Sequence, residues 1–389
     1  MVGPTKALSK RRSGRPWRVL ITQKYASLGG SQTSLVHHLE CLDRSLFEPY
    51  VLVSNKGWLT SRLDEMGIPW SLLAFGHWTN PLWLVQNARL ILKVRRLIKA
   101  RQIDVVHANE HWVGPVSYVA ARLAGIPVIC HFRTGLGDLT PGRVRKYLYG
   151  RYDKVIAVAE VLRGELLKYV ADPSKITVIR DGVAPALDIP SYRSHASRRI
   201  LINVGAIYRV KGQAIIADAV MPWLKANPRN YLVFVGGTRE DPAYFEGIRH
   251  SVTENGLARQ VRFLGSRKDV PRLLGLADAL VAYSSVEGVP MVVMEAMFAG
   301  RPVIVSNTRG MDEVVTDDEV GHIVDFENGK QKLADVLEDL RVNPGRWKVM
   351  GQRARERAAA RYSTRAMSNA IQAVYKEVLE IEDNAAVRA

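Results

Sequence analysis

The sequence predicts an α/β protein with two Rossmann-like, doubly wound domains. Short apolar segments that are typical of buried parallel strands alternate with segments of helical period along most of the chain. This alternation favours parallel sheets covered by helices on both faces. The chain has 389 residues, enough for two or three domains. One stretch, 184–198, lacks periodicity and is rich in Pro, Ser and Arg, which predicts a linker.

The composition is that of an ordinary globular protein, with 47% hydrophobic and 24% charged residues. No apolar run reaches the roughly 18 to 20 residues that span a bilayer, and the N-terminus lacks the apolar core of a signal peptide. The two cysteines, Cys41 and Cys130, lie far apart without metal-ligand spacing, so we expect reduced, buried thiols. These features predict a cytoplasmic protein.

The formal net charge of +17 is concentrated in the first half of the chain. Residues 1–190 hold 27 Lys and Arg against 14 Asp and Glu, whereas the remaining residues hold 28 against 24. Residues 1–16 carry five cations among Ser, Gly and Pro, which predicts a disordered basic arm. The first half is therefore expected to meet an anionic partner: a phosphorylated substrate, an anionic membrane face or nucleic acid.

The first domain is predicted to begin with a strand at 17–22, followed by the turn Gly29-Gly30 and a helix. Paired glycines fit a plain β-α turn, and they also let a backbone approach a bound phosphate closely. Asn109 and His131 close two later strands, at the edge where doubly wound sheets bind ligands. A structural histidine at a strand end is the alternative for His131. The further strands and strand units are expected at 49–54, 104–109, 126–133, 154–167 and 175–183.

The second domain is predicted to open with the strand ILINVG, which leads into a loop carrying Arg209 and Lys211. These two cations are either solvated or form a clamp on a diphosphate. The later strands are expected at 231–237, 261–265, 277–285 and 302–306.

The rest of the chain is organised around the stretch 284–315. Glu287 and Glu295 flank a turn and the start of a helix near Pro290. A helix that begins there offers unpaired backbone N–H groups and its positive dipole end to an anion. Glu313 follows the next strand and returns to the same edge. Taken alone, these carboxylates would be ordinary solvated groups around β-α turns.

The complete string resembles a family signature. The segments EGVPMVVME, AGRPVIVS and GMDEVV are similar to the motifs of retaining, nucleotide-sugar-dependent glycosyltransferases of the GT-B fold, family 4. The resemblance implies two Rossmann-like domains facing a central cleft, with an acceptor-binding domain over 17–184 and a nucleotide-sugar-binding domain over 199–362. It also implies that the C-terminal helix in 363–389 crosses back to the first domain.

The same resemblance implies roles for individual residues. The catalytic residues are expected to be His131, Arg209, Lys211 and Glu287. Glu295 suits the ribose diol, because a carboxylate can accept from two hydroxyls, and Glu287 suits the hydroxyls of the donor sugar. The residues expected to bind the donor are Gly29, Gly30, Gly205, Gly265, Gly288, Val289, Pro290, Met291, Val292 and Glu295.

Two positions depart from the family pattern. Asp181 stands in place of an Asn, and Ala206 stands where an Arg is expected. Either Arg209 serves in place of that arginine, or the diphosphate relies mainly on Lys211. The sequence has no convincing Asp-x-Asp pair, so these cations and the helix start near Pro290 are expected to replace a metal, and no other cofactor is expected.

The implied reaction moves a hexose, with retention, from a UDP- or GDP-linked sugar to a lipid-linked or saccharide acceptor, in the biosynthesis of cell-surface polysaccharide or lipopolysaccharide. The acceptor side is inferred from a helix at 82–101, which has six cations from Arg89 onward. The region between Glu65 and Asp104 has no acid. A second basic and aromatic cluster lies at 143–152. The residues expected to meet the acceptor or an anionic membrane are Arg89, Lys93, Arg95, Arg96, Lys99 and Asn109.

Such contact would place the protein at the inner face of the cytoplasmic membrane. The alternative is that the helix at 82–101 packs on the sheet and leaves a solvated basic face. A rival function is a nucleic-acid-binding module, but the clustered Glu287, Glu295 and Glu313 would repel phosphates, so no nucleic-acid partner is expected. The enzymatic rivals are a sugar-nucleotide epimerase or a phosphorylase of the same fold.

Overall fold

The computed structural model describes residues 14–76, 83–134, 146–184, 198–238, 240–285, 290–308, 310–325 and 329–381, without the side chains of 83–86. The chain forms two compact units. The first combines Met1–Gly182 with Thr364–Ala389, and the second is Val183–Ser363. Most of the predicted basic arm and of the predicted linker lies outside the described residues.

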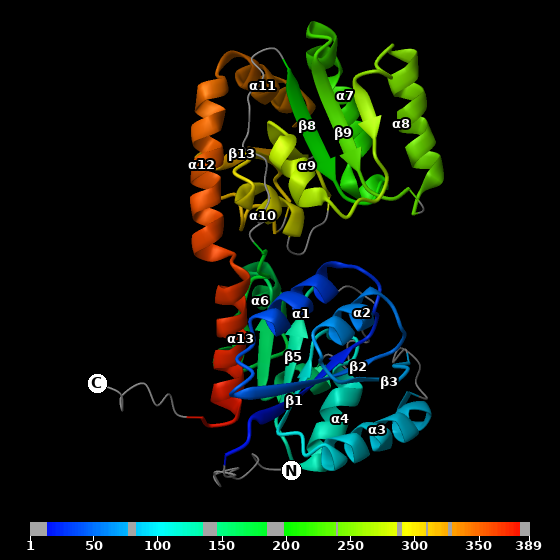
Figure 1. The fold of residues 1–389 in the computed structure, drawn as a ribbon, viewed down its shortest axis with the longest axis vertical. Coiled ribbons are helices and arrows are strands. Elements are labelled where there is room, and N and C mark those ends of the chain that lie inside the picture. The colour runs from blue at the N-terminus through cyan, green and yellow to red at the C-terminus, as the bar shows by residue number, and fades with distance from the viewer. Residues whose placement is uncertain are drawn as a thin grey trace, which may run out of the picture. The chain divides into compact units, whose positions relative to one another are not determined.

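The first unit contains a seven-stranded sheet with the order β3-β2-β1-β4-β5-β6-β7, and its described strand pairs are parallel (Figure 1). The order reverses direction between β1 and β4. The strands are β1 (Trp17–Gln23), β2 (Phe47–Val53), β3 (Trp70–Leu72), β4 (Val105–Ala108), β5 (Val128–Phe132), β6 (Lys154–Ala157) and β7 (Ile176–Val178). The helices of this unit are α1 (Gly30–Glu40), α2 (Trp58–Glu65), α3 (Trp83–Ala100), α4 (Gly114–Ala124), α6 (Glu160–Leu166) and α13 (Thr364–Val378).

The second unit contains a six-stranded parallel sheet with the order β10-β9-β8-β11-β12-β13, which reverses between β8 and β11. The strands are β8 (Arg199–Val204), β9 (Asn230–Val235), β10 (Val261–Phe263), β11 (Ala279–Ala282), β12 (Val303–Ser306) and β13 (Gly321–Val324). The helices are α7 (Gln213–Ala226), α8 (Pro242–Glu254), α9 (Val270–Leu276), α10 (Met291–Phe298), α11 (Gly329–Val342) and α12 (Pro344–Arg361).

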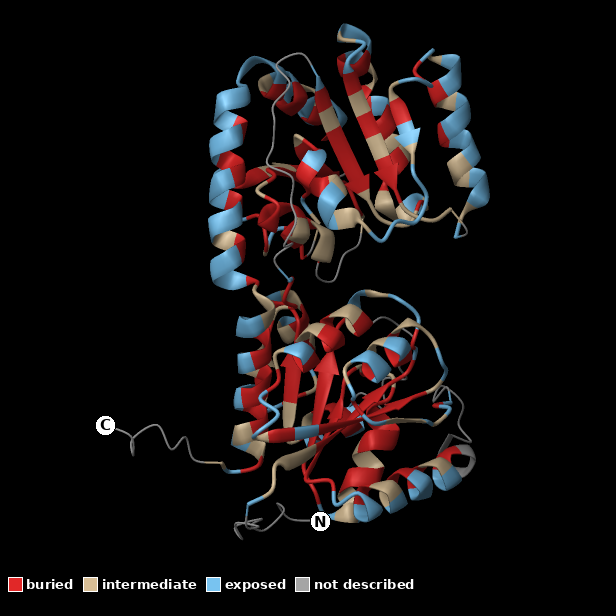
Figure 2. Cartoon of the chain, viewed as in Figure 1, coloured by how far each residue is buried: buried red, intermediate tan, exposed pale blue. Residues whose placement is uncertain are grey.

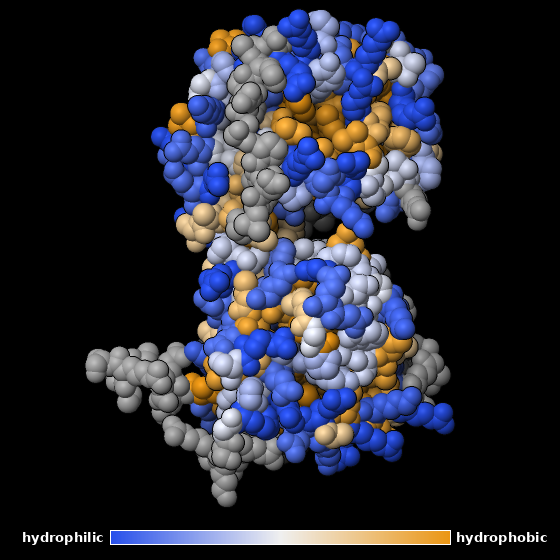
Figure 3. All heavy atoms as spheres, viewed as in Figure 1, coloured by the Kyte–Doolittle hydropathy of each residue, from blue (hydrophilic) through white to orange (hydrophobic). Residues whose placement is uncertain are grey.

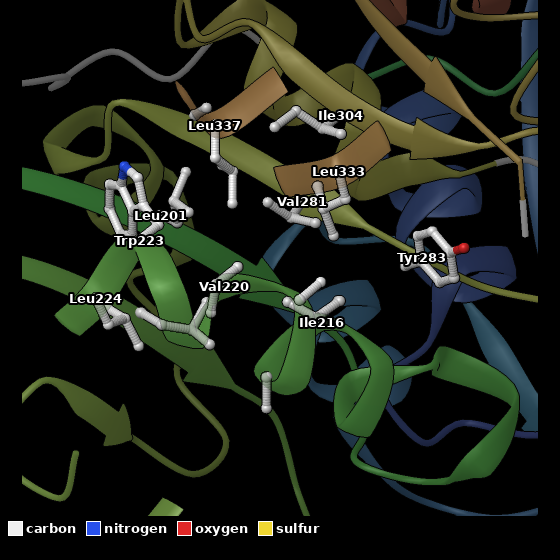
Figure 4. Close-up of a cluster of buried hydrophobic side chains, with 14 of the residues drawn as sticks. Leu201, Ile216, Val220, Trp223, Leu224, Val281, Tyr283, Ile304, Leu333 and Leu337 are labelled. Atoms are coloured by element: carbon white, nitrogen blue, oxygen red, sulfur yellow. The ribbon is translucent and has the colours of Figure 1, made fainter. Parts of the chain in front are cut away.

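The strands are apolar because they are covered on both faces. Residues of β1, β4, β5, β8, β11 and β12 are almost all buried, whereas the helices alternate buried and exposed positions (Figure 2). In the second unit, side chains of α7 and α11 pack onto β8, β11 and β12 around Trp223, Val281 and Leu337 (Figure 4). The predicted α/β fold with two doubly wound sheets is therefore confirmed.

The C-terminal helix α13 packs on α1 within the first unit. His38 of α1 contacts α13 through two hydrogen bonds: its Nδ1 lies 3.0 Å from Ser368 Oγ and its Nε2 3.2 Å from Tyr375 Oη. The Tyr375 ring also packs edge-on against Phe47, with ring centroids 5.4 Å apart. A polar and aromatic contact therefore fixes this helix beside the sheet. Among the described helices, none is long and apolar enough to cross a membrane.

Candidate active site

The carboxyl ends of β1, β4 and β5 bring polar side chains together in the first unit. Gln23 ends β1, Asn109 follows β4 directly, and His131 lies near the end of β5. Asn109 Nδ2 donates to Gln23 Oε1 over 2.6 Å. The sheet order reverses between β1 and β4, which is the place where doubly wound sheets bind ligands.

His131 is completely buried and its ring stacks on His107, with centroids 5.6 Å apart. His107 Nδ1 in turn lies 2.7 Å from Tyr375 Oη of α13. Burial, followed by the nearby charge of Arg133, holds the pKa of His131 well below its usual range, so the imidazole is neutral. Among the described residues, its buried Nε2 has no hydrogen-bond partner.

Sequence reasoning missed Arg133, two residues after His131. Its side chain is buried and forms an ion pair with Asp181. Asp181 is the residue that departs from the expected Asn, so the structure supplies a reason for the departure: a carboxylate there neutralises a buried guanidinium. The sequence offered one signal for Arg133, namely a cation at the end of an apolar segment that is typical of a buried strand.

The turn Gly29-Gly30 leads into α1, but an acid already lies beside this helix start. Ser31 Oγ donates to Glu110 Oε1 over 2.6 Å, and the buried Glu110 Oε2 has no partner among the described residues. Gly29 has φ −170°, which any residue can adopt. A carboxylate at this point disfavours a phosphate and favours a hydroxyl donor. The donor-binding role of Gly29 and Gly30 stays a prediction, and Glu110 is a candidate that the sequence analysis did not name.

In the second unit, the loop after β8 lies beside the end of β11. Gly205 has φ +155°, and a Cβ built on Gly236 would lie 1.9 Å from the Gly205 carbonyl oxygen, so both positions require glycine. The backbone N–H of Ser285 donates to the Val210 carbonyl over 2.8 Å. Lys211 therefore lies at the reversal point between β8 and β11, with its aliphatic chain against Gly205.

Arg209 lies on the same turn as Lys211, and its side chain pairs with Asp241. Its Nε lies 3.3 Å from Asp241 Oδ2, and its guanidinium lies 5.5 Å from the centre of the Tyr244 ring. The side chain is 76% exposed. Whether Arg209 replaces the arginine expected at Ala206 stays open, and its present partner is an acid.

Helix α10 begins directly after Pro290, as predicted, and carries Glu295 in its second turn. Val293 and Met294 are fully buried in the core, and Met291 and Val292 are half-buried, so the helix is fixed on the sheet.

The Glu295 carboxylate is half-buried and makes no hydrogen bond or ion pair with the described residues. Burial raises the pKa of Glu295 from 4.5 to about 7. A desolvated carboxylate without a partner suits a ligand that brings hydroxyl donors.

The remaining predicted donor-binding residues are only partly visible. Gly265 has φ +64° after β10, and its carbonyl accepts from Gly236 N over 3.0 Å. Glu287, Gly288 and Val289 lie outside the described residues. No group of three or more His, Cys, Asp or Glu side chains within the described ranges is arranged to hold a metal ion.

Comparison with known proteins identifies the family to which the chain belongs. Residues 28–187 match the family description Glycosyltransferase Family 4, and residues 187–357 match Glycosyl transferases group 1. The chain belongs to glycosyltransferase family 4. The enzyme is therefore a retaining hexosyltransferase that takes its sugar from a nucleotide-sugar, which favours this interpretation over the nucleic-acid-binding and epimerase alternatives.

The family 4 enzyme has curated relatives with different acceptors. It is 26% identical over 344 residues to the UDP-Gal:alpha-D-GlcNAc-diphosphoundecaprenol alpha-1,3-galactosyltransferase of Escherichia coli, covering 81% of this chain and 87% of the relative. It is also 26% identical over 315 residues to the alpha-maltose-1-phosphate synthase of Mycolicibacterium smegmatis, covering 72% of this chain and 80% of the relative.

Solved structures show that the family 4 enzyme has the GT-B fold. Anabaena HepE in complex with UDP and glucose is similar with a TM-score of 0.78 and 21% identity, over 93% of this chain and 100% of that chain. The lipopolysaccharide outer core galactosyltransferase WaaB in its apo form is similar with a TM-score of 0.72 and 16% identity, over 92% and 99% of the two chains. At these identities the likeness concerns the fold alone.

The predicted basic helix of the enzyme is α3, and its cations differ in their surroundings. Arg89, Lys93, Arg96 and Lys99 are exposed. Arg95 is half-buried, and its Nε donates to the Leu123 carbonyl of α4 over 3.0 Å. Four of the five predicted cations therefore form an exposed basic face, whereas Arg95 ties α3 to α4.

Proposed function

We propose that this family 4 enzyme transfers a hexose from a UDP-hexose to a lipid-linked saccharide at an anionic membrane surface, in the biosynthesis of cell-surface polysaccharide or lipopolysaccharide. The donor part of the proposal is carried by one observation: Glu295 is a desolvated carboxylate without a described partner, on a helix that starts at the β8/β11 reversal point. The choice of uridine is supported by the name of the galactosyltransferase relative and by the UDP complexes of HepE.

The donor site has a place for each part of the nucleotide-sugar. We assign the diphosphate to Lys211 and the N-terminus of α10, because they follow the neighbouring strands β8 and β11 at the reversal point of the sheet and offer a cation and helix N–H groups. The ribose diol donates to Glu295. Glu287, four residues before Met291 at the start of α10, is assigned to the hydroxyls of the sugar as the family resemblance implies.

His131 contributes a hydrogen-bond donor rather than a base. The ring is neutral because of its burial, and its Nε2 has no described partner. A neutral donor can bind a sugar oxygen without adding positive charge to the site. Glu110, at the neighbouring strand end, is assigned to a hydroxyl of the acceptor saccharide, because its Oε2 is a buried acceptor without a described partner. The side-chain amide of Asn109, which was expected to meet the acceptor, is instead bonded to Gln23 and Arg133.

The lipid-linked acceptor is supported by the exposed basic face of α3, formed by Arg89, Lys93, Arg96 and Lys99. Two apolar side chains accompany this face: Leu92 on α3 is 43% exposed and Leu123 on α4 is 51% exposed. Figure 3 shows hydrophilic side chains with apolar ones among them over this edge of the first unit. Exposed cations and exposed leucines on two helices that pack together suit an interface with anionic headgroups. The galactosyltransferase relative is named for a diphospholipid-linked acceptor.

Two measurements test the proposal. The first follows thermal shifts with a panel of nucleotides and nucleotide-sugars, and then transfer to a diphospholipid-linked sugar. A shift with UDP-hexoses and retained anomeric configuration in the product are expected. A shift with GDP-sugars alone, or transfer only to a water-soluble acceptor, would contradict the proposal.

The second measurement is sedimentation with anionic vesicles at low and high salt. Each cation near the surface contributes about 1 kcal/mol, so Lys93→Gln/Arg96→Gln/Lys99→Gln should weaken vesicle binding by about 3 kcal/mol. Donor affinity should stay unchanged. A matched control removes three exposed cations from the second unit, at Lys225, Arg259 and Arg262. If both triple variants pellet equally with the vesicles, α3 does not bind the membrane and has only a structural role.

A further inference from the structure

The guanidinium of Arg133 is enclosed by acceptors from four parts of the first unit. Nε donates to the Asn109 carbonyl over 3.1 Å, and Nη2 donates to Asn109 Oδ1 over 2.9 Å and to His131 Nδ1 over 3.2 Å. Nη1 donates to Ser34 Oγ over 3.0 Å and forms the ion pair with Asp181 Oδ1. The side chains of Arg133 and Asp181 are 5% and 8% exposed.

These contacts use every donor that an arginine has. A guanidinium carries five N–H groups and does not lose its proton in a protein, so it cannot accept a hydrogen bond. Its one Nε–H and four Nη–H groups match the five acceptors around it. The contact with His131 therefore fixes the direction of that hydrogen bond: Arg133 donates and Nδ1 accepts. Because a neutral imidazole has one N–H, the proton of His131 lies on Nε2.

We propose that Arg133, anchored by Asp181, is a positioning residue that fixes His131 as the Nε2–H tautomer. The ring then presents a donor, and never an acceptor, at its free nitrogen. The inference rests on the proposed role of His131 as a hydrogen-bond donor to the sugar, and it adds the group that enforces that role.

Asp181 and Ser34 hold Arg133 in place, because both bind its Nη1. Ser34 Oγ accepts from Arg133 and donates to Asp181 Oδ1 over 2.5 Å, so the carboxylate is bound by both. An Asn at 181 would leave the guanidinium charge uncompensated in a buried place. Arg133 also holds the backbone and the side chain of Asn109, so the ends of β4 and β5 share one anchor.

The tautomer can be measured directly on the full-length enzyme by side-chain nitrogen NMR after selective labelling of its nine histidines. The His131 signals are assigned from their loss in His131→Gln. The expected result for the unmodified enzyme at pH 7 to 8 is a protonated Nε2 and an unprotonated Nδ1. A protonated Nδ1 would overturn the inference, whatever the activity of any variant.

The double variant Arg133→Met/Asp181→Asn removes both buried charges together, so that neither is left uncompensated. We expect the Nδ1–H tautomer to become populated and kcat to fall tenfold or more, with donor Kd unchanged. Arg133→Lys, which keeps a cationic donor, should recover part of kcat. The matched control is Arg199→Met/Asp278→Asn, which removes another little-exposed ion pair in the second unit and should leave both the tautomer and kcat unchanged.

The failures of the two ideas are distinguishable. If His131→Gln keeps full activity while the unmodified enzyme shows the Nε2–H tautomer, the proposed role of His131 fails and the positioning by Arg133 stands. If the charge-free double variant keeps the Nε2–H tautomer and full kcat, the positioning role of Arg133 is overturned.

Discussion

Replacing Glu295 with Gln should stabilise the free enzyme and weaken donor binding at the same time. The carboxylate lies in the second turn of α10, half-buried and without a described partner. Burial raises its pKa from 4.5 to about 7. A desolvated carboxylate without a partner destabilises the folded protein. We therefore attribute the presence of Glu295 at this position to a ligand that it binds.

The size of the effect follows from the pKa. A carboxyl group with a raised pKa binds protons more tightly in the folded state, so stability is lost as pH rises from 4.5 to about 7. At about 1.4 kcal/mol per pH unit, this difference amounts to about 3 kcal/mol as an upper value, since the group is not fully buried. Below pH 4.5 the carboxyl is protonated in both states and the effect vanishes.

The assay compares chemical denaturation of Glu295→Gln and the unmodified enzyme at pH 4.5 and pH 8, with Glu356→Gln on the exposed face of α12 as the control. The variant should be more stable at pH 8 and equal at pH 4.5. Donor binding, measured by calorimetry at pH 8, should weaken by about 1–3 kcal/mol, because the ribose hydroxyls lose a charged acceptor. An unchanged donor Kd, or a variant that is less stable at pH 8, would refute the reasoning.

Three further predictions concern the proposed catalytic and acceptor groups. Lys211→Met should lower kcat by on the order of 10² to 10³, because the leaving diphosphate loses a fixed positive charge; single-turnover rates near the unmodified value would refute this. Transfer should continue in EDTA, because cations and the α10 N-terminus do the work of a metal; complete loss that Mg²⁺ or Mn²⁺ restores is the contrary result. Glu110→Gln should raise the acceptor KM by about 5- to 100-fold with donor Kd unchanged, since Oε2 would lose its charge. An acceptor KM that does not move would remove Glu110 from the site.

The architecture could be predicted from the sequence because it depends on local patterns. Strands such as β1 and β12 are buried on both faces and appear as continuous apolar runs. The strand β3, WSL at Trp70–Leu72, was not predicted, because it has three residues and none of them is buried. Short edge strands of this kind take their structure from their neighbours rather than from their own pattern.

Single candidate residues could be named where chemistry is concentrated in one segment. Glu295 and Pro290 belong to a contiguous stretch, and burial raises the pKa of Glu295, whose role in donor binding stays a prediction. Arg133 was missed because its partner Ser34 lies 99 positions away and Asp181 lies 48 positions away. A single sequence gives the residue types but not which distant residues pair.

The two departures from the family pattern differ in their structural consequences. Asp181 is compensated, since Arg133 supplies the charge that makes a buried carboxylate favourable. The missing arginine at Ala206 has no such compensation, because the guanidinium of Arg209 lies against Asp241 and is largely exposed. A guanidinium that must leave an acid before it binds a phosphate contributes less to the stabilisation of the diphosphate than its full charge would provide.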